Sequence, residues 1–195
     1  MRRTFTILLL FGLATGLIPR SSPADEPGKT VMPFNGADLN GWKFKGDAKR
    51  SKWVVGRATL DEKNPTKLQV TVIPPEADGG PAVRELINAS SGVDLYSEQK
   101  FGDCTIDIEF MVPKGSNSGI YVMGEYEVQI LDSFGRTKVG PGDLGGLYGA
   151  AAPKVNASKK PGEWQRFIIE FKAPRFEEER RSATPGSSRS PSTTR

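Results

Sequence analysis

The sequence contains no histidine and only one cysteine, Cys104. Without an imidazole, the chain cannot use Ser-His-Asp or Cys-His catalysis, and it has no histidine-ligated zinc site. A single cysteine also excludes an intrachain disulfide. The sequence has no long heptad pattern, and its 22 Gly and 15 Pro residues argue against a helical bundle or a coiled coil. A length of 195 residues suits one domain better than two.

The sequence also lacks a basic central region. Its net charge of +4 comes from the two ends, because residues 1–24 carry +3 and residues 175–195 carry +2. Residues 25–174 therefore have a net charge of −1. A nucleic-acid-binding face needs a basic patch on the folded part of a protein. The charge distribution predicts no nucleic-acid partner.

The N-terminal region has the pattern of an export signal. Two arginines precede an apolar run over residues 5–18, which is short for a bilayer span. Ser22-Pro23-Ala24 supplies small residues before a cleavage site at Asp25. We therefore expect a signal peptide over 1–24, a secreted or periplasmic product, and no stable membrane insertion after cleavage. An uncleaved anchor helix is the alternative.

The C-terminal region has a different composition. Residues 177–195 contain charged residues, Ser, Thr and Pro, but no large apolar residue. Such a segment cannot bury enough apolar surface to offset the entropy lost on ordering. We expect a folded domain over 31–176 and a disordered tail over 177–195.

The central region has the patterns of short β-strands. Residues 104–112 alternate, with Cys104 and other apolar side chains on one face and Asp107 and Glu109 on the other. We interpret that polar row as the solvent-facing side of the sheet. Cys104 is expected as a small buried residue in mid-strand. Similar runs predict further strands at 52–55, 67–73, 119–123, 126–131 and 164–171. Short strands with Gly and Pro turns predict an all-β fold, an antiparallel β-sandwich or jelly roll.

One predicted strand carries a polar row of candidate functional residues: Glu127, Gln129 and Asp132. Strict alternation places Asp132 opposite Glu127, so these carboxylates meet only if the strand ends or bulges near Leu131. A salt bridge is the alternative role for Glu127. Glycine-rich loops leave room for a ligand near this strand. The glycines are Gly115, Gly119, Gly124, Gly135, Gly140, Gly142, Gly145, Gly146 and Gly149.

An ordered set of motifs spans 33–172: Phe34–Trp42, Phe101–Asp103, Gly115–Tyr121, Tyr126–Asp132, Gly146–Gly149 and Lys160–Trp164. In order and spacing this set resembles the 3-keto-disaccharide hydrolase family. The resemblance implies a concanavalin-like jelly roll. Many members carry an arginine where Met123 stands, and many continue for several strands beyond the strand at Trp164. The resemblance therefore implies a jelly roll that is incomplete at its C-terminal end.

The same resemblance implies activity on the glycosidic bond of a sugar oxidised at C3. The ketone acidifies the C2 proton, so a base can remove it and expel the C1 substituent, after which water adds. A general base and a general acid each contribute on the order of 10²–10⁴-fold. This route does not need the oxocarbenium chemistry of ordinary glycosidases.

The resemblance also assigns roles to individual residues. Glu127 is expected as the base or acid, with Asp132 as its partner. The expected sugar-binding residues are Asn117, Tyr121, Gln129, Tyr148 and Trp42, of which Tyr148 and Trp42 would stack on the sugar. A core position is the alternative for Trp42.

A small carbohydrate is the expected partner. No metal or cofactor is predicted, although the sequence leaves open a carbonyl-rich calcium site. A non-catalytic carbohydrate-binding sandwich and an inactive truncated fragment are the alternative functions.

Overall fold

A computed structural model describes residues 8–10, 30–75 and 84–174 of the chain, and for residues 8–10 it describes the backbone. The predicted tail over 177–195 lies outside these residues, as does nearly all of the predicted signal peptide. The described part is almost entirely β-structure. Its elements are β1 (Leu8–Leu10), β2 (Trp42–Lys45), the 3₁₀ helix η1 (Ala48–Arg50), β3 (Trp53–Leu60), β4 (Leu68–Val72), β5 (Glu85–Asn88), β6 (Asp94–Ser97), β7 (Cys104–Met111), β8 (Asn117–Val122), β9 (Tyr126–Leu131) and β10 (Gln165–Phe171).

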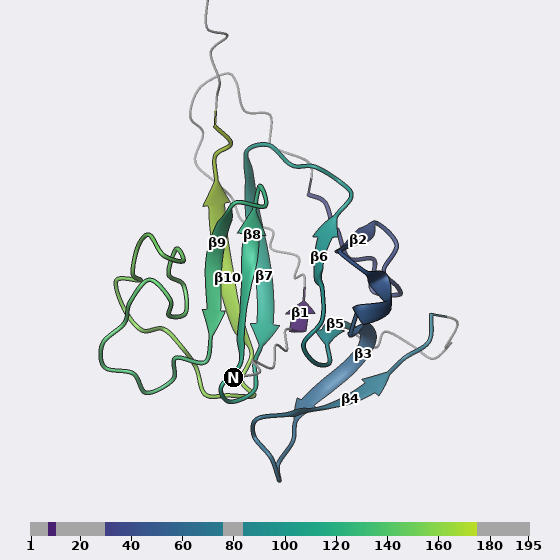
Figure 1. The fold of residues 1–195 in the computed structure, drawn as a ribbon, viewed down its shortest axis with the longest axis horizontal. Helices are drawn as coiled ribbons and strands as arrows, with labels where there is room; N and C mark the ends of the chain where they lie inside the picture. Colours follow the sequence, from purple (N-terminus) through teal and green to yellow (C-terminus); the bar gives the residue numbers. More distant parts are fainter. Residues whose placement is uncertain (1–7, 11–29, 76–83, 175–195) are drawn as a thin grey trace, which may run out of the picture.

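The strands form three antiparallel sheets, which confirms the predicted fold class. The largest sheet has the order β10-β7-β1-β5-β3-β4, and β2 pairs with β6 while β8 pairs with β9. Each predicted strand is present, although β3 extends five residues beyond the predicted 52–55, whereas β1, β2, β5 and β6 were not predicted as strands. Figure 1 shows the β8–β9 hairpin in front of β7 and β10. Within the described residues, no helix is long and apolar enough to cross a membrane.

Apolar side chains between the sheets create a β-sandwich. Phe110 of β7 packs with Ile130 of β9, and the Phe110 ring centroid lies 4.8 Å from that of Phe167. Beside this cluster, Leu86 of β5 packs with half-buried residues that include Trp42 of β2. Both two-stranded sheets therefore cover one face of the large sheet. Burial of these side chains supplies the main drive for folding, at about 25 cal/mol per Å² of apolar surface.

The opposite face of the large sheet has an apolar part and a polar part. Ile87 and Met111 form a buried cluster there, packed against Trp164. On the β7–β10 side, the Arg166 guanidinium donates two hydrogen bonds to the Asp107 carboxylate, one of them 2.6 Å long from Nε to Oδ1. These hydrogen bonds lower the pKa of Asp107. The polar row predicted on β7 is therefore an outer surface.

The position of Cys104 corrects one expectation. The residue begins β7 rather than lying in mid-strand, and it is half-buried. Burial, with a smaller contribution from Asp103, raises the pKa of its thiol. Raising this pKa disfavours the reactive thiolate form, as expected for a packing cysteine.

Gly162 provides a test of how tightly the loop before β10 packs. Its φ is +85°, and a Cβ there would lie 2.9 Å from Leu60 Cβ. Gly36 is a matched control, with φ of +76° and no neighbour within 4 Å of an added Cβ. Gly162→Ala should lower the free energy of unfolding by about 2–4 kcal/mol, because overlap adds to the strain of positive φ. Gly36→Ala should lower it by only about 1 kcal/mol. Denaturant unfolding measures both, and equal losses would contradict the packing.

Candidate functional site

The β8–β9 hairpin is the framework of the candidate site. Its pairing is regular from Asn117 opposite Leu131 to Val122 opposite Tyr126. The connecting turn has positive φ at Met123 (58°) and at the glycine that follows it. Two positive φ values in succession are the requirement of a type I′ turn, whose twist matches that of a hairpin. This register places Tyr121 directly opposite Glu127.

A loop segment pairs with the other edge of β9. The backbone N–H of Gly145 donates to the Gln129 carbonyl, and the Gln129 N–H donates to the Gly146 carbonyl, each at 2.9 Å. The Tyr148 N–H donates to the Glu127 carbonyl, also at 2.9 Å. Because these bonds continue the ladder, they place the Tyr148 backbone beside Glu127.

The loop that carries Tyr148 is held by the buried carboxylate of Asp143. This carboxylate accepts hydrogen bonds from the Gly140 N–H at 2.7 Å, Ser133 Oγ at 3.1 Å and Arg136 Nη1 at 2.6 Å. Burial raises the pKa of Asp143, but the hydrogen bonds and the Arg136 charge outweigh that effect, so the pKa is lowered overall. The charged carboxylate is thus the form that fixes this loop.

The hairpin and the loop enclose a cavity of about 200 Å³. Tyr121, Tyr126 and Tyr148 are each about half exposed, so the cavity offers aromatic surface to a ligand. No group of three or more potential metal ligands occurs in the part of the chain that the structure describes. The residues that line the cavity are Tyr121, Glu125, Tyr126, Glu127, Leu147, Tyr148 and Ala150.

A second, larger hollow has different chemistry. Its volume is about 340 Å³, and it is open to solvent. Neither an aromatic nor an acidic side chain lines it. The residues around it are Lys49, Arg50, Lys52, Ser91 and Gly92.

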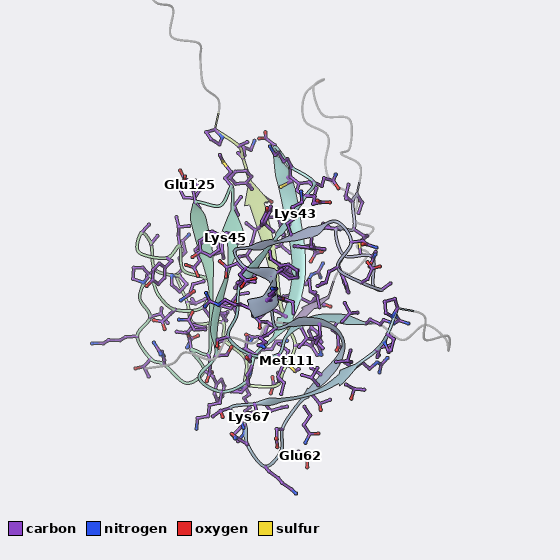
Figure 2. All side chains as sticks on the ribbon, turned by 45° about the vertical axis from the view of Figure 1, so that its right-hand side comes forward. Lys43, Lys45, Glu62, Lys67, Met111 and Glu125 are labelled. Atoms are coloured by element: carbon purple, nitrogen blue, oxygen red, sulfur yellow. The ribbon has the colours of Figure 1, made fainter. Side chains whose placement is uncertain are left out.

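The closest functional pair in the cavity is Tyr121 and Glu127. The Tyr121 hydroxyl donates a hydrogen bond of 2.8 Å to Glu127 Oε2. This hydrogen bond, helped by burial and by the Glu127 charge, raises the pKa of Tyr121 to about 12. Lys45 Nζ lies 5.8 Å from the centroid of the Tyr121 ring, within cation–π range. Figure 2 shows Lys45 and Glu125 on the same side of the molecule.

Gly119 makes room for the Glu127 side chain. A Cβ at Gly119 would lie 2.2 Å from Glu127 Oε1 and 2.5 Å from its Cγ. The sequence pattern predicts Gly119 as a loop glycine, but the residue lies within β8. Its missing side chain leaves space for a neighbouring carboxylate. The glycine therefore allows Glu127 to lie flat across the hairpin.

The structure does not bring Asp132 to Glu127. Asp132 follows the last residue of β9, and five extended residues span about 17 Å. The β9 register has no bulge near Leu131 that would turn the strand. The Asp132 carboxylate instead accepts hydrogen bonds from the backbone N–H groups of Gly115 at 2.9 Å and Phe134 at 3.3 Å. It closes the opposite end of the hairpin.

Three other predicted residues also lie away from the cavity. Gln129 is 2% exposed, and its Nε2 donates to the Gly142 carbonyl at 3.1 Å, so it supports the loop from beneath. Asn117 begins β8 at the end of the hairpin that Asp132 closes. Trp42 is half-buried against the core, with its Nε1 donating to the Pro33 carbonyl at 3.1 Å.

The cavity contains three residues that the sequence predicted, Glu127, Tyr121 and Tyr148, and others that it missed. Tyr126 and Leu147 stood in the quoted motifs, but no pattern within those motifs separates an exposed side chain from a buried one. Glu125 directly follows the hairpin turn and lines the cavity as a second carboxylate. Its position directly after a glycine turn is the sequence signal that could have identified it as a site residue.

The Tyr121–Glu127 hydrogen bond can be tested by titration. We expect one tyrosine to ionise near pH 12 in the wild-type protein and to return toward about 10 in Glu127→Gln. Because the folded pKa is higher than the unfolded value, the bond stabilises the fold below about pH 10 and loses this effect as the pH rises through 12. Phenolate absorbance measures the transition, and Tyr121→Phe identifies it. An unchanged titration in Glu127→Gln would contradict this hydrogen bond.

Comparison with known proteins agrees with the ordered motifs. The family model of the 3-keto-alpha-glucoside-1,2-lyase-like domain matches residues 29–178, well over half of the chain. No curated protein and no solved structure matches this chain. The family assignment supports a carbohydrate-active role, and the cavity lies within the matched residues. The chain therefore belongs to the 3-keto-alpha-glucoside-1,2-lyase-like domain family, as its motifs predicted.

Proposed function

We propose that this protein cleaves the glycosidic bond of 3-keto-glycosides by elimination followed by hydration. The observation that carries the proposal is the 2.8 Å hydrogen bond between Tyr121 and Glu127 at the mouth of an aromatic cavity. It joins a carboxylate to a phenol that is protonated at neutral pH, because the pKa of Tyr121 is raised to about 12. A base and an acid therefore stand side by side.

The reaction uses this pair in sequence. The Glu127 carboxylate takes the proton from C2 of the sugar, and the C2–H electrons form the C1=C2 double bond as the C1–O bond breaks. The leaving oxygen receives a proton from the Tyr121 hydroxyl, which is replenished from the protonated Glu127. Water then adds to C1 of the enone and a proton returns to C2, so the overall change is hydrolysis. Proton transfer of this kind contributes on the order of 10²–10⁴-fold for each group.

The cavity accommodates one sugar ring. Its volume of about 200 Å³ is below the roughly 300–1,000 Å³ of pockets for drug-sized ligands. We place the 3-keto ring inside, against the exposed rings of Tyr126 and Tyr148, and the leaving group outside. Glu125 lies at the rim and is a candidate to hydrogen-bond a sugar hydroxyl.

The proposal includes export. A signal peptide over 1–24, a domain over 31–176 and a secreted or periplasmic location fit an enzyme that meets its sugar outside the cytoplasm. Support for the export step comes from the sequence pattern alone.

A non-catalytic carbohydrate-binding role is the second candidate. The observation in its favour is the exposure of Tyr121, Tyr126 and Tyr148, each about half accessible around one cavity. Aromatic rings with accessible faces can stack on sugars without any reaction. Binding of a 3-keto-glycoside without turnover would select this candidate over the enzyme.

Glu127→Gln tests the base. We expect kcat for release of nitrophenol from a nitrophenyl 3-keto-glucoside to fall by roughly 10²–10⁴-fold, with KM nearly unchanged. Exchange of the C2 hydrogen with D₂O should fall in parallel. Glu62→Gln is the control, since Glu62 lies exposed in the loop after β3, apart from Glu125 at the site (Figure 2). Full activity in Glu127→Gln would exclude this residue as the base.

Tyr121→Phe tests the acid. It removes the hydroxyl that protonates the leaving oxygen but keeps the Glu127 carboxylate, so cleavage of a glycoside with a basic leaving group should separate from C2 exchange. For a 3-keto-disaccharide, whose leaving group is basic, we expect kcat to fall by about 10²-fold or more while C2 exchange persists. A nitrophenyl leaving group needs less protonation, so its release should fall much less. Equal losses for both substrates would argue against an acid role.

A further inference from the structure

The centre of the six-stranded sheet contains a short strand from a distant part of the sequence. β5 and β7 do not pair with each other, because β1 lies between them and pairs antiparallel with both (Figure 1). Leu8 is in register with Ile87 and Met111, and Leu9 with Leu86 and Phe110. This three-residue strand therefore joins the two halves of the sheet.

The position between β5 and β7 is lined by buried apolar residues on both faces. Leu86 and Phe110 belong to the face that the other sheets cover, and neither is exposed to solvent. Ile87 and Met111 belong to the opposite face, with exposures of 0% and 3%. A strand buried on both faces needs a continuous apolar run rather than alternation. Three successive leucines meet that requirement.

β5 and β7 cannot pair directly with each other through a small movement. Since β1 is antiparallel to both, β5 and β7 run parallel to each other, about 10 Å apart at the usual strand spacing. Pairing them directly would move one half of the sheet by about 5 Å. That movement would separate Phe110 of β7 from its packing partner Ile130, or Leu86 of β5 from Trp42.

We propose that the position between β5 and β7 is an acceptor site for an extended apolar peptide strand, which β1 holds until the leader is removed. β1 lies in the apolar run over 5–18, and cleavage at the predicted site before Asp25 would break its covalent link to the domain, so that another strand can displace it. The unpaired backbone groups of two strands would then face a gap one strand wide. Such a gap binds a peptide by strand addition, with main-chain hydrogen bonds on both sides. The partner it fits is an extended segment with at least three successive apolar residues and no proline.

The test uses the full chain with one charge placed in β1. Leu9→Asp should increase the amide exchange rates of Leu86 and Met111 by about tenfold or more, because these residues of β5 and β7 lose their partner strand. Leu17→Asp is the matched control, with the same change in the same apolar run but outside β1, and it should leave these rates unchanged. Equal exchange in the two variants would overturn the proposal.

Adding a peptide tests acceptance of a partner. The probe is a synthetic peptide of residues 5–12 with two lysines at each end. It should restore slow exchange in Leu9→Asp, whereas the same peptide with aspartate at each leucine should not. Failure of the apolar peptide to restore protection would overturn the proposal. Protection that returns with protein concentration alone would overturn it in favour of strand exchange between two copies.

A second design applies if Leu9→Asp fails to fold. A specific protease site placed between Ala24 and Asp25 allows the folded wild-type chain to be cut. We expect the released segment to stay bound, to co-elute on gel filtration and to be displaced by the lysine-flanked peptide. Release of the segment with no change in the exchange of Leu86 and Met111 would show that the sheet does not need this strand.

Discussion

Hydrogen bonding along both edges of β9 is the constraint on which the candidate site depends. One edge pairs with β8 and fixes Tyr121 opposite Glu127. The other edge binds the loop through the carbonyl of Glu127 and both backbone groups of Gln129, which brings in Tyr148. Backbone ladders of this kind leave little freedom in register. Backbone pairing of β8, β9 and the loop therefore brings Tyr121, Glu127 and Tyr148 together at one cavity.

Two further features support that arrangement from behind. The buried Asp143 carboxylate gathers Gly140, Ser133 and Arg136, so the loop carrying Tyr148 has a fixed base. The absent side chain of Gly119 leaves the space that the Glu127 carboxylate occupies. Preorganisation matters here because a base and an acid that are already in contact need little rearrangement when a substrate binds. The chemistry proposed for this cavity relies on that contact.

The sandwich as a whole depends on the continuity of its large sheet. β7 and β10 lie beneath the functional hairpin, while β5, β3 and β4 lie on the other side of β1. Phe110 links β7 to the hairpin through Ile130, so the large sheet packs directly against the layer that carries the site.

The sequence by itself determined the fold class and most strands, because alternation with period two and glycine turns are local properties. It also determined the family, through motifs in a fixed order, and it singled out Glu127, Tyr121 and Tyr148. It could not separate these from Asp132 or Gln129, since all five lie in polar or glycine-rich stretches. Only the tertiary structure decided that Asp132 closes the far end of the hairpin and that Gln129 is buried beneath the loop. Pairing between distant segments sets those positions, and the placement of β1 in the sheet is likewise a long-range contact that local sequence patterns do not encode.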